Sequence, residues 1–218
     1  MKKEHLIEKT ARYIQQEFSH EGSGHDWWHI HRVWQLAQWI ARREGASVFI
    51  VEMAALLHDL DDWKLSQPNE AKARKWMEQL GIPPNDQQTI QQVIDQVSFK
   101  GAGVDTTPDS LEARVVQDAD RLDAMGAIGI ARTFAYGGHK NRLIYDPEEQ
   151  PVLHDSFDAY QQSTGPTINH FYEKLLLLKD RINTATGQKL ARQRHQFMEH
   201  YLEQFFREWN NHEQPLTL

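Results

Sequence analysis

The sequence of 218 residues contains no cysteine. Without cysteine the chain can form no disulfide, no thiolate nucleophile, no iron–sulfur cluster and no zinc ribbon. A metal site would therefore have to use histidine, carboxylate and water ligands. Twelve histidines are present, and their number is the feature of the composition that needs an explanation.

Long hydrophobic runs are also absent. The longest uninterrupted leucine run is Leu175 to Leu178, and the polar residues from Met1 to His5 lead into an amphipathic segment without an apolar signal-peptide core. A membrane-spanning helix needs about 20 mostly apolar residues. We therefore expect a cytoplasmic protein without a membrane span.

Positive charge is in deficit, with 24 Lys and Arg against 31 Asp and Glu and a formal net charge of −7. Such a balance disfavours binding to bulk nucleic acid, because phosphate contacts need clustered cations. A local basic pocket could still hold a small anion. With 39% hydrophobic and 25% charged residues, we expect a soluble protein with a single domain over residues 1–218.

Helical periodicity dominates the sequence, and no stretch has the alternation of a strand or the signals of a hairpin. Asp26, Ser47 and Asp86 are suited to cap three of the helices, and Gly45 to end one. The segments 100–109 and 137–151 resemble loops. The fold class is therefore all-α, with helices predicted over residues 6–18, 30–41, 47–57, 70–80, 86–97, 111–134, 167–182 and 188–209.

A histidine and an aspartate stand side by side at three places, of which one is notable. His58-Asp59 ends an apolar segment, residues 53–57, whereas the pairs at 25–26 and 154–155 lie at a helix start and in a loop. A buried imidazole and carboxylate are costly unless they find partners or bind a metal. A single pair of this kind is weak support for a site, because about one is expected by chance in such a composition.

Two further elements favour a metal. His29 lies early in a predicted helix, and Asp118, Asp120 and Asp123 follow a segment predicted to be buried. Together with His58-Asp59, these residues supply two imidazoles and two carboxylates from three helices. Asp118 and Asp123 compete with Asp120 for the ligand role. Taken singly, a histidine or aspartate of this kind is more often a helix cap or a satisfied core residue than a metal ligand.

The ordered set of His29 in His-x-x-Arg-Val, His58-Asp59, and Asp120 in Asp-Ala-Asp-Arg-Leu resembles the HD-domain superfamily of metal-dependent phosphohydrolases. The chain is most similar to small stand-alone bacterial HD hydrolases, which share the later segments 98–101 and 170–175. The resemblance covers residues from about 20 to 210. It implies an HD-type helical bundle around a buried divalent metal.

The resemblance further implies that His29, His58, Asp59 and Asp120 bind this metal. We expect one ion, because no histidine lies between residues 60 and 138, where two-metal members carry a tandem pair. Mn²⁺ or Mg²⁺ is favoured, although the ligand types also suit Fe²⁺, Co²⁺, Ni²⁺ or Zn²⁺. A bound divalent ion lowers the pKa of its water from about 15.7 toward about 7 and polarises a phosphoryl oxygen.

Asp62 follows His58 by four residues, so a continuing helix would place it on the same face as a general acid or base. Fixed cations stabilise the charge that develops during phosphoryl transfer. Arg32 could instead hold a ligating carboxylate. The cations predicted to bind substrate phosphates are Lys64, Lys100, Arg121 and Lys174.

The predicted reaction is hydrolysis of a nucleotide, with release of pyrophosphate from a nucleoside triphosphate. Two alternatives are a 5′-nucleotidase or phosphodiesterase of the same fold, and a non-catalytic nucleotide-binding HD module. The tryptophans at 27, 28, 34 and 39 could stack on a base, but aromatic residues on an amphipathic helix usually pack in the core. The aromatic residues 197–209 are expected to pack as well, and could contribute to a homodimer contact.

Overall fold

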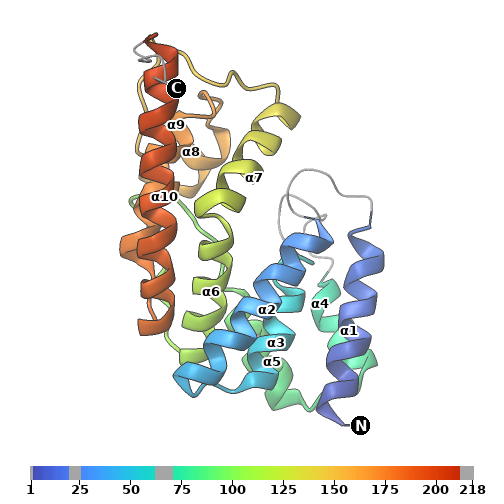
Figure 1. The fold of residues 1–218 in the computed structure, drawn as a ribbon. Helices are drawn as coiled ribbons and strands as arrows, with labels where there is room; N and C mark the ends of the chain where they lie inside the picture. Colours follow the sequence, from blue (N-terminus) through green and yellow to red (C-terminus); the bar gives the residue numbers. More distant parts are fainter. Residues whose placement is uncertain (1, 20–25, 62–70, 212–218) are drawn as a thin grey trace, which may run out of the picture.

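The computed structural model describes residues 2–19, 26–61 and 71–211, except for the side chains of residues 160 and 161. Helices and connecting loops make up these ranges, which contain no strand, as the sequence predicts (Figure 1). The helices are α1 (Lys3–Glu17), α2 (Trp27–Glu44), α3 (Val48–Leu57), α4 (Lys72–Gln79), α5 (Pro84–Ile94), α6 (Leu111–Asp123), α7 (Gly126–His139), α8 (Phe157–Gln162), α9 (Asn169–Glu173), the 3₁₀-helix η1 (Leu175–Arg181) and α10 (Ala185–Trp209).

Helix α3 forms the centre of the core. Nine of its ten residues, from Phe49 to Leu57, are buried, because apolar side chains surround the helix on all sides. Helices α2 and α6 pack against α3 and against each other, and α1 and α5 cover α3 from further sides. In Figure 1, α1 to α5 gather in one part of the molecule, and α6 lies between them and α10.

The ends of α2 follow the expected chemistry. Asp26 caps its start by accepting a hydrogen bond of 2.8 Å from the backbone N–H of His29. Gly45 ends the helix with a φ of 77°, a left-handed conformation that glycine adopts without strain. Both ends thus agree with the sequence prediction, and the capped first turn fixes the backbone of His29.

Three predictions about the elements are corrected. Helix α5 begins at Pro84, so Asp86 lies in its first turn and is not the cap. The predicted helix 111–134 is divided into α6 and α7, and α7 extends to His139, within the predicted loop 137–151. The predicted helix 167–182 is instead the short α9 followed by η1.

Each correction has a physical reason. Proline is favoured at the first position of a helix, where its missing N–H is not needed. Gly126 has a φ of 70°, which a continuous right-handed helix does not accommodate. In η1, Leu175 and Leu178 are both buried, because three residues per turn bring positions three apart onto one side.

Candidate metal centre

Three packed helices bring the predicted ligands together. His29 lies in the first turn of α2, His58 and Asp59 directly follow α3, and Asp120 lies in the last turn of α6. His29, His58 and Asp59 are buried, whereas the side chain of Asp120 is 27% exposed. The cluster is therefore enclosed on the protein side and open at Asp120.

The ligand atoms of these residues converge. The Nε2 atom of His29 lies 3.3 Å from Oδ2 of Asp59 and 3.5 Å from Oδ1 of Asp120. The Nε2 atom of His58 lies 3.3 Å from Oδ1 of Asp59 and 3.9 Å from Oδ1 of Asp120. One ligand atom each from His29, His58 and Asp120 lies within 4.8 Å of the others. Such a group could hold a metal ion, with Asp59 beside it.

In both histidine rings, the hydrogen bond made by Nδ1 fixes the ring so that Nε2 faces the cluster. Nδ1 of His58 donates to the backbone carbonyl of Ala55 at 2.9 Å, and Nδ1 of His29 donates to Oδ2 of Asp123 at 2.7 Å. In the neutral tautomers assigned from these bonds, both Nε2 lone pairs point toward carboxylate oxygens. Acceptors that face acceptors repel each other unless a cation lies between them. The arrangement therefore fits a divalent ion.

The electrostatics of His29 support the same interpretation. Burial and the charge of Arg132 lower the pKa of His29, but the carboxylates of Asp123 and Asp59 outweigh them and raise it above the usual value. The carboxylates around the ring thus favour positive charge at this position. A metal ion would supply that charge in place of a proton.

Asp123 orients His29 and is itself held by two arginines. Its Oδ1 accepts from Nε of Arg32 at 2.8 Å, and its Oδ2 accepts from Nη1 of Arg132 at 3.0 Å. Burial raises the pKa of Asp123, but the bonds from His29 and Arg32 and the nearby positive charge lower it well below its usual range. Asp123 is therefore a carboxylate that fixes the imidazole, as the outer partners of metal-binding histidines commonly do.

The three aspartates of α6 have different partners. Asp118 accepts hydrogen bonds from the backbone and side chain of both Asn183 and Thr184. These bonds tie it to the start of α10, and Asp123 faces Arg32 and His29. Of the three, only Asp120 has its carboxylate beside both Nε2 atoms.

The predicted cations are spread over several environments. Lys100 is exposed, and Nζ of half-buried Lys174 lies 5.2 Å from the centre of the Phe99 ring. The guanidinium of Arg121 is buried and donates to Oγ1 of Thr106 at 2.8 Å and to the carbonyl of Arg181. Burial lowers the pKa of Arg121 to about 10, so it stays charged at neutral pH. The predicted Asp62 and Lys64 lie outside the described residues.

Sequence reasoning missed Arg132. It lies on α7, nine residues after Asp123, and its guanidinium reaches back to that carboxylate. No local motif marks it, because the contact depends on the break between α6 and α7. An arginine shortly after a predicted ligand helix is the one signal that the sequence offers.

The comparisons agree with this geometry. The family model described as the HD domain matches residues 27–125, the segment that carries all four predicted ligands. The chain is 39% identical to the Bacillus subtilis protein YpgQ over 208 residues, which cover 94% of each chain. It therefore belongs to the HD-domain superfamily.

Solved structures share the fold over nearly the whole chain. A Lactobacillus plantarum protein is 38% identical with a TM-score of 0.86, and the match covers 97% of this chain and 100% of that one. A Bacillus thuringiensis HD-superfamily hydrolase is 43% identical with a TM-score of 0.74, covering 96% and 99%. YpgQ has been solved in complex with ADP, at a TM-score of 0.74, 36% identity and coverage of 93% and 97%. The fold is thus that of the stand-alone HD-superfamily hydrolases.

Proposed function

We propose that this protein is a divalent-metal-dependent phosphohydrolase that releases pyrophosphate from nucleoside triphosphates. The observation that carries the proposal is the convergence of the Nε2 atoms of His29 and His58 on the carboxylates of Asp59 and Asp120. A set of two imidazoles and two carboxylates suits Mn²⁺ and related ions, of which we favour Mn²⁺ or Mg²⁺.

The chemistry of the site follows from this set. When bound, a divalent ion would activate a water molecule at neutral pH and polarise a phosphoryl oxygen. His29, His58, Asp59 and Asp120 would hold the ion, and Asp123 would keep His29 in the required tautomer. We assign Asp62 the role of transferring a proton to or from the reacting oxygen.

Positive charge beside the cluster supports a phosphate-bearing substrate. The side chains of Arg32 and Arg132 are 35% and 17% exposed while both hold Asp123. We assign these two guanidinium groups to the phosphate oxygens of the substrate, because planar donors recognise phosphate well. We still predict that the substrate phosphates contact Lys64, Lys100 and Lys174.

A nucleotide substrate has support from a relative. YpgQ, which has been solved in complex with ADP, has the same fold as this chain and a similar length. A nucleoside diphosphate presents both a base and a phosphoanhydride. We therefore propose a nucleotide for this chain as well, and a cytoplasmic location, where nucleoside triphosphates are made and used.

The experiment is a panel of nucleoside tri-, di- and monophosphates incubated with the protein and Mn²⁺, with products identified by chromatography and ³¹P NMR. We expect monophosphate and pyrophosphate in equal amounts from a triphosphate. Chelation should abolish the release, and added Mn²⁺ should restore it.

Other product patterns would replace the proposal. Inorganic phosphate released from monophosphates would identify a 5′-nucleotidase, and cleavage only of an added phosphodiester would identify a phosphodiesterase. Nucleotide binding without turnover in a sample that contains metal would identify a non-catalytic module.

A further inference from the structure

A second pocket lies apart from the four predicted metal ligands, none of which lines it. It has a volume of about 420 Å³ and lies between the loop after Gly101 and the junction of η1 and α10. This volume is in the range of small-ligand sites. Its polar lining consists of Asp105, Thr106, Thr107, Arg121, Asp180, Arg181 and Asn183.

Arg121 is a buried cation in this pocket that forms no ion pair with any described residue, although the charges of Asp118 and Asp120 act on it. Only 4% of the residue is exposed, and no carboxylate oxygen in the described part of the chain lies within 4.0 Å of its nitrogens. Its Nη atoms bond to Thr106 and the carbonyl of Arg181, whereas its buried Nε makes no hydrogen bond within the described ranges. Burial of an unpaired charge is costly, so the position favours a bound anion.

Arg181 adds a second guanidinium to the same pocket. It donates to the carbonyls of Gly101, at 3.2 Å, and Ala102, and its Cζ lies 5.1 Å from the centre of the Phe99 ring. These contacts fix the group at the edge of the pocket. Two arginines that face one cavity form the donor arrangement that recognises oxyanions.

Within the described part of the chain, the nearby carboxylates form no ion pair with Arg121 or Arg181. Asp105 accepts from the backbone N–H of Thr107 at 2.9 Å and from its Oγ1 at 2.7 Å. Asp118 is occupied by Asn183 and Thr184, and Asp180 is exposed. Asp105 and Asp180 therefore lie exposed on the rim of the pocket, Asp118 is buried outside its lining, and Arg121 is the buried charge of the pocket.

We propose that this pocket binds a phosphate-type oxyanion, such as phosphate, pyrophosphate or the phosphate of a nucleoside monophosphate, between Arg121 and Arg181. The hydroxyl group of Thr106 accepts from Arg121 and keeps its own hydrogen as a further donor. Arg121 thus serves this pocket and not the metal centre. Binding here does not depend on the proposed reaction.

The experiment is calorimetric titration of the full chain with phosphate, pyrophosphate and adenosine monophosphate, both as purified and after chelation of metal. We expect one equivalent of at least one of these anions to bind to the chelated protein. Arg181→Gln should weaken this binding at least tenfold. Asp180→Asn should strengthen it several-fold, because it removes negative charge from the rim without touching either arginine.

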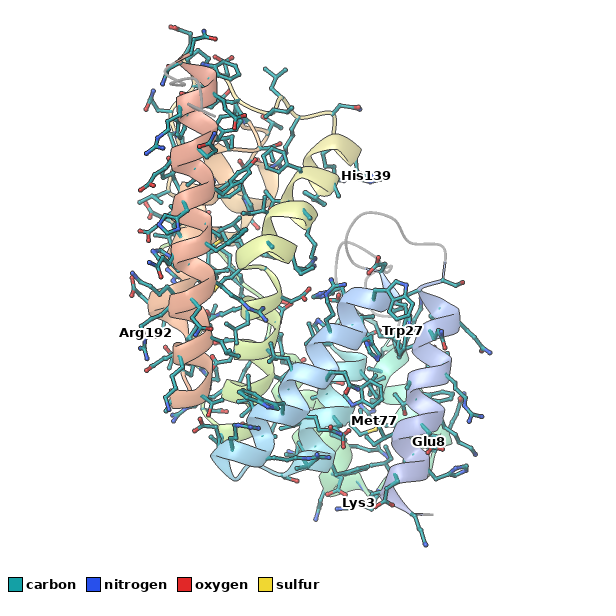
Figure 2. The ribbon with its side chains drawn as sticks, in the orientation of Figure 1. Lys3, Glu8, Trp27, Met77, His139 and Arg192 are labelled. Atoms are coloured by element: carbon teal, nitrogen blue, oxygen red, sulfur yellow. The ribbon has the colours of Figure 1, made fainter. Side chains whose placement is uncertain are left out.

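The matched control is Arg192→Gln, which removes a charge from the exposed face of α10 (Figure 2) at a residue that does not line the pocket. Its affinity should equal that of the unmodified protein. Circular dichroism should show that each variant is folded. The proposal is overturned if no anion binds to the chelated protein, or if Arg181→Gln and Asp180→Asn both bind with unchanged affinity.

Discussion

Asp123 is the residue on which the geometry of His29 depends most directly. Its carboxylate holds the Nδ1–H of the ring at 2.7 Å and is in turn held by Arg32 and Arg132. The ring cannot turn about its axis without breaking this bond. The direction of its Nε2 lone pair is thus determined by a residue that need not touch the metal.

We predict that Asp123→Asn weakens Mn²⁺ binding by about 10- to 100-fold, because the outer partner of a metal-binding histidine has effects of this size. The loss of charge also leaves Arg32 and Arg132 without their carboxylate. Titration of Mn²⁺ followed by electron paramagnetic resonance measures the change. Asp158→Asn, at an exposed position of α8, is the matched control, and an equal affinity in the two variants would refute the role of Asp123.

The sequence predicts a metal ligand among the aspartates of α6, but the local pattern alone does not indicate which aspartate it is. Asp118, Asp120 and Asp123 lie within one and a half turns, and all follow buried apolar residues. The choice depends on partners distant in the chain, namely Asn183 and Thr184 for Asp118 and His29 for Asp123. Local patterns carry no information about such contacts.

Asp62 is the residue to which we assign proton transfer. Asp62→Asn should keep the bound ion but lose most of kcat, since an amide cannot exchange a proton in the same way. Metal content and steady-state kinetics, measured on one preparation, separate the two effects. A loss of metal in proportion to activity would instead make Asp62 a ligand.

At the scale of elements, the break between α6 and α7 shapes the site. It allows α7 to turn so that Arg132 meets Asp123. The turn is tight. An added Cβ at Gly129 would lie 2.2 Å from the carbonyl oxygen of Ala124, whereas one at Gly138, near the other end of α7, would meet nothing within 4 Å.

We therefore predict opposite effects for the same substitution at these two glycines. Gly129→Ala should lower the free energy of unfolding by about 1–3 kcal/mol, because the backbone at the turn has to move. Gly138→Ala should leave the free energy unchanged or raise it by up to about 1 kcal/mol, since alanine favours the helix. Urea unfolding measures both, and equal stability of the two variants would contradict the close packing at the turn.

The sequence predicts some helices better than others, because some depend on local signals and others on distant contacts. The helices α2 and α3 lie where the sequence predicts them, because runs of apolar residues are local signals. The cap of Asp26 on α2 is confirmed, whereas Ser47 precedes α3 without a side-chain cap hydrogen bond. The sequence of the segment 167–182, with four consecutive leucines, predicts one helix. Lys174, with φ of −141° and ψ of −60°, interrupts it, and the packing that favours this interruption comes from the rest of the fold.

At the scale of the whole molecule, one hydrophobic core includes side chains from α1 to α7, α9, η1 and α10. Helix α6 connects its parts, because it packs against α2, α3, α5, α7 and α10. Within the described ranges, no helix combines the length and the apolar character that crossing a bilayer requires.

The homodimer remains a prediction. Size-exclusion chromatography with light scattering would test it.

The continuous core predicts that the chain unfolds in one cooperative step. Tryptophan fluorescence reports mainly on the first half of the chain, where Trp27, Trp34 and Trp76 pack, whereas far-UV circular dichroism reports on all helices. The two urea transitions should coincide. Two separate midpoints would show that residues 1–218 do not behave as the single domain that we expect.

The most direct test of the central claim is the rate of pyrophosphate release by Asp59→Ala, measured with Mn²⁺ beside the unmodified protein. Asp59 lies 3.3 Å from both Nε2 atoms, so its removal should take away a ligand of the ion. We predict that the variant loses nearly all activity and retains its helical circular dichroism spectrum. Full activity in Asp59→Ala would show that hydrolysis does not use this centre.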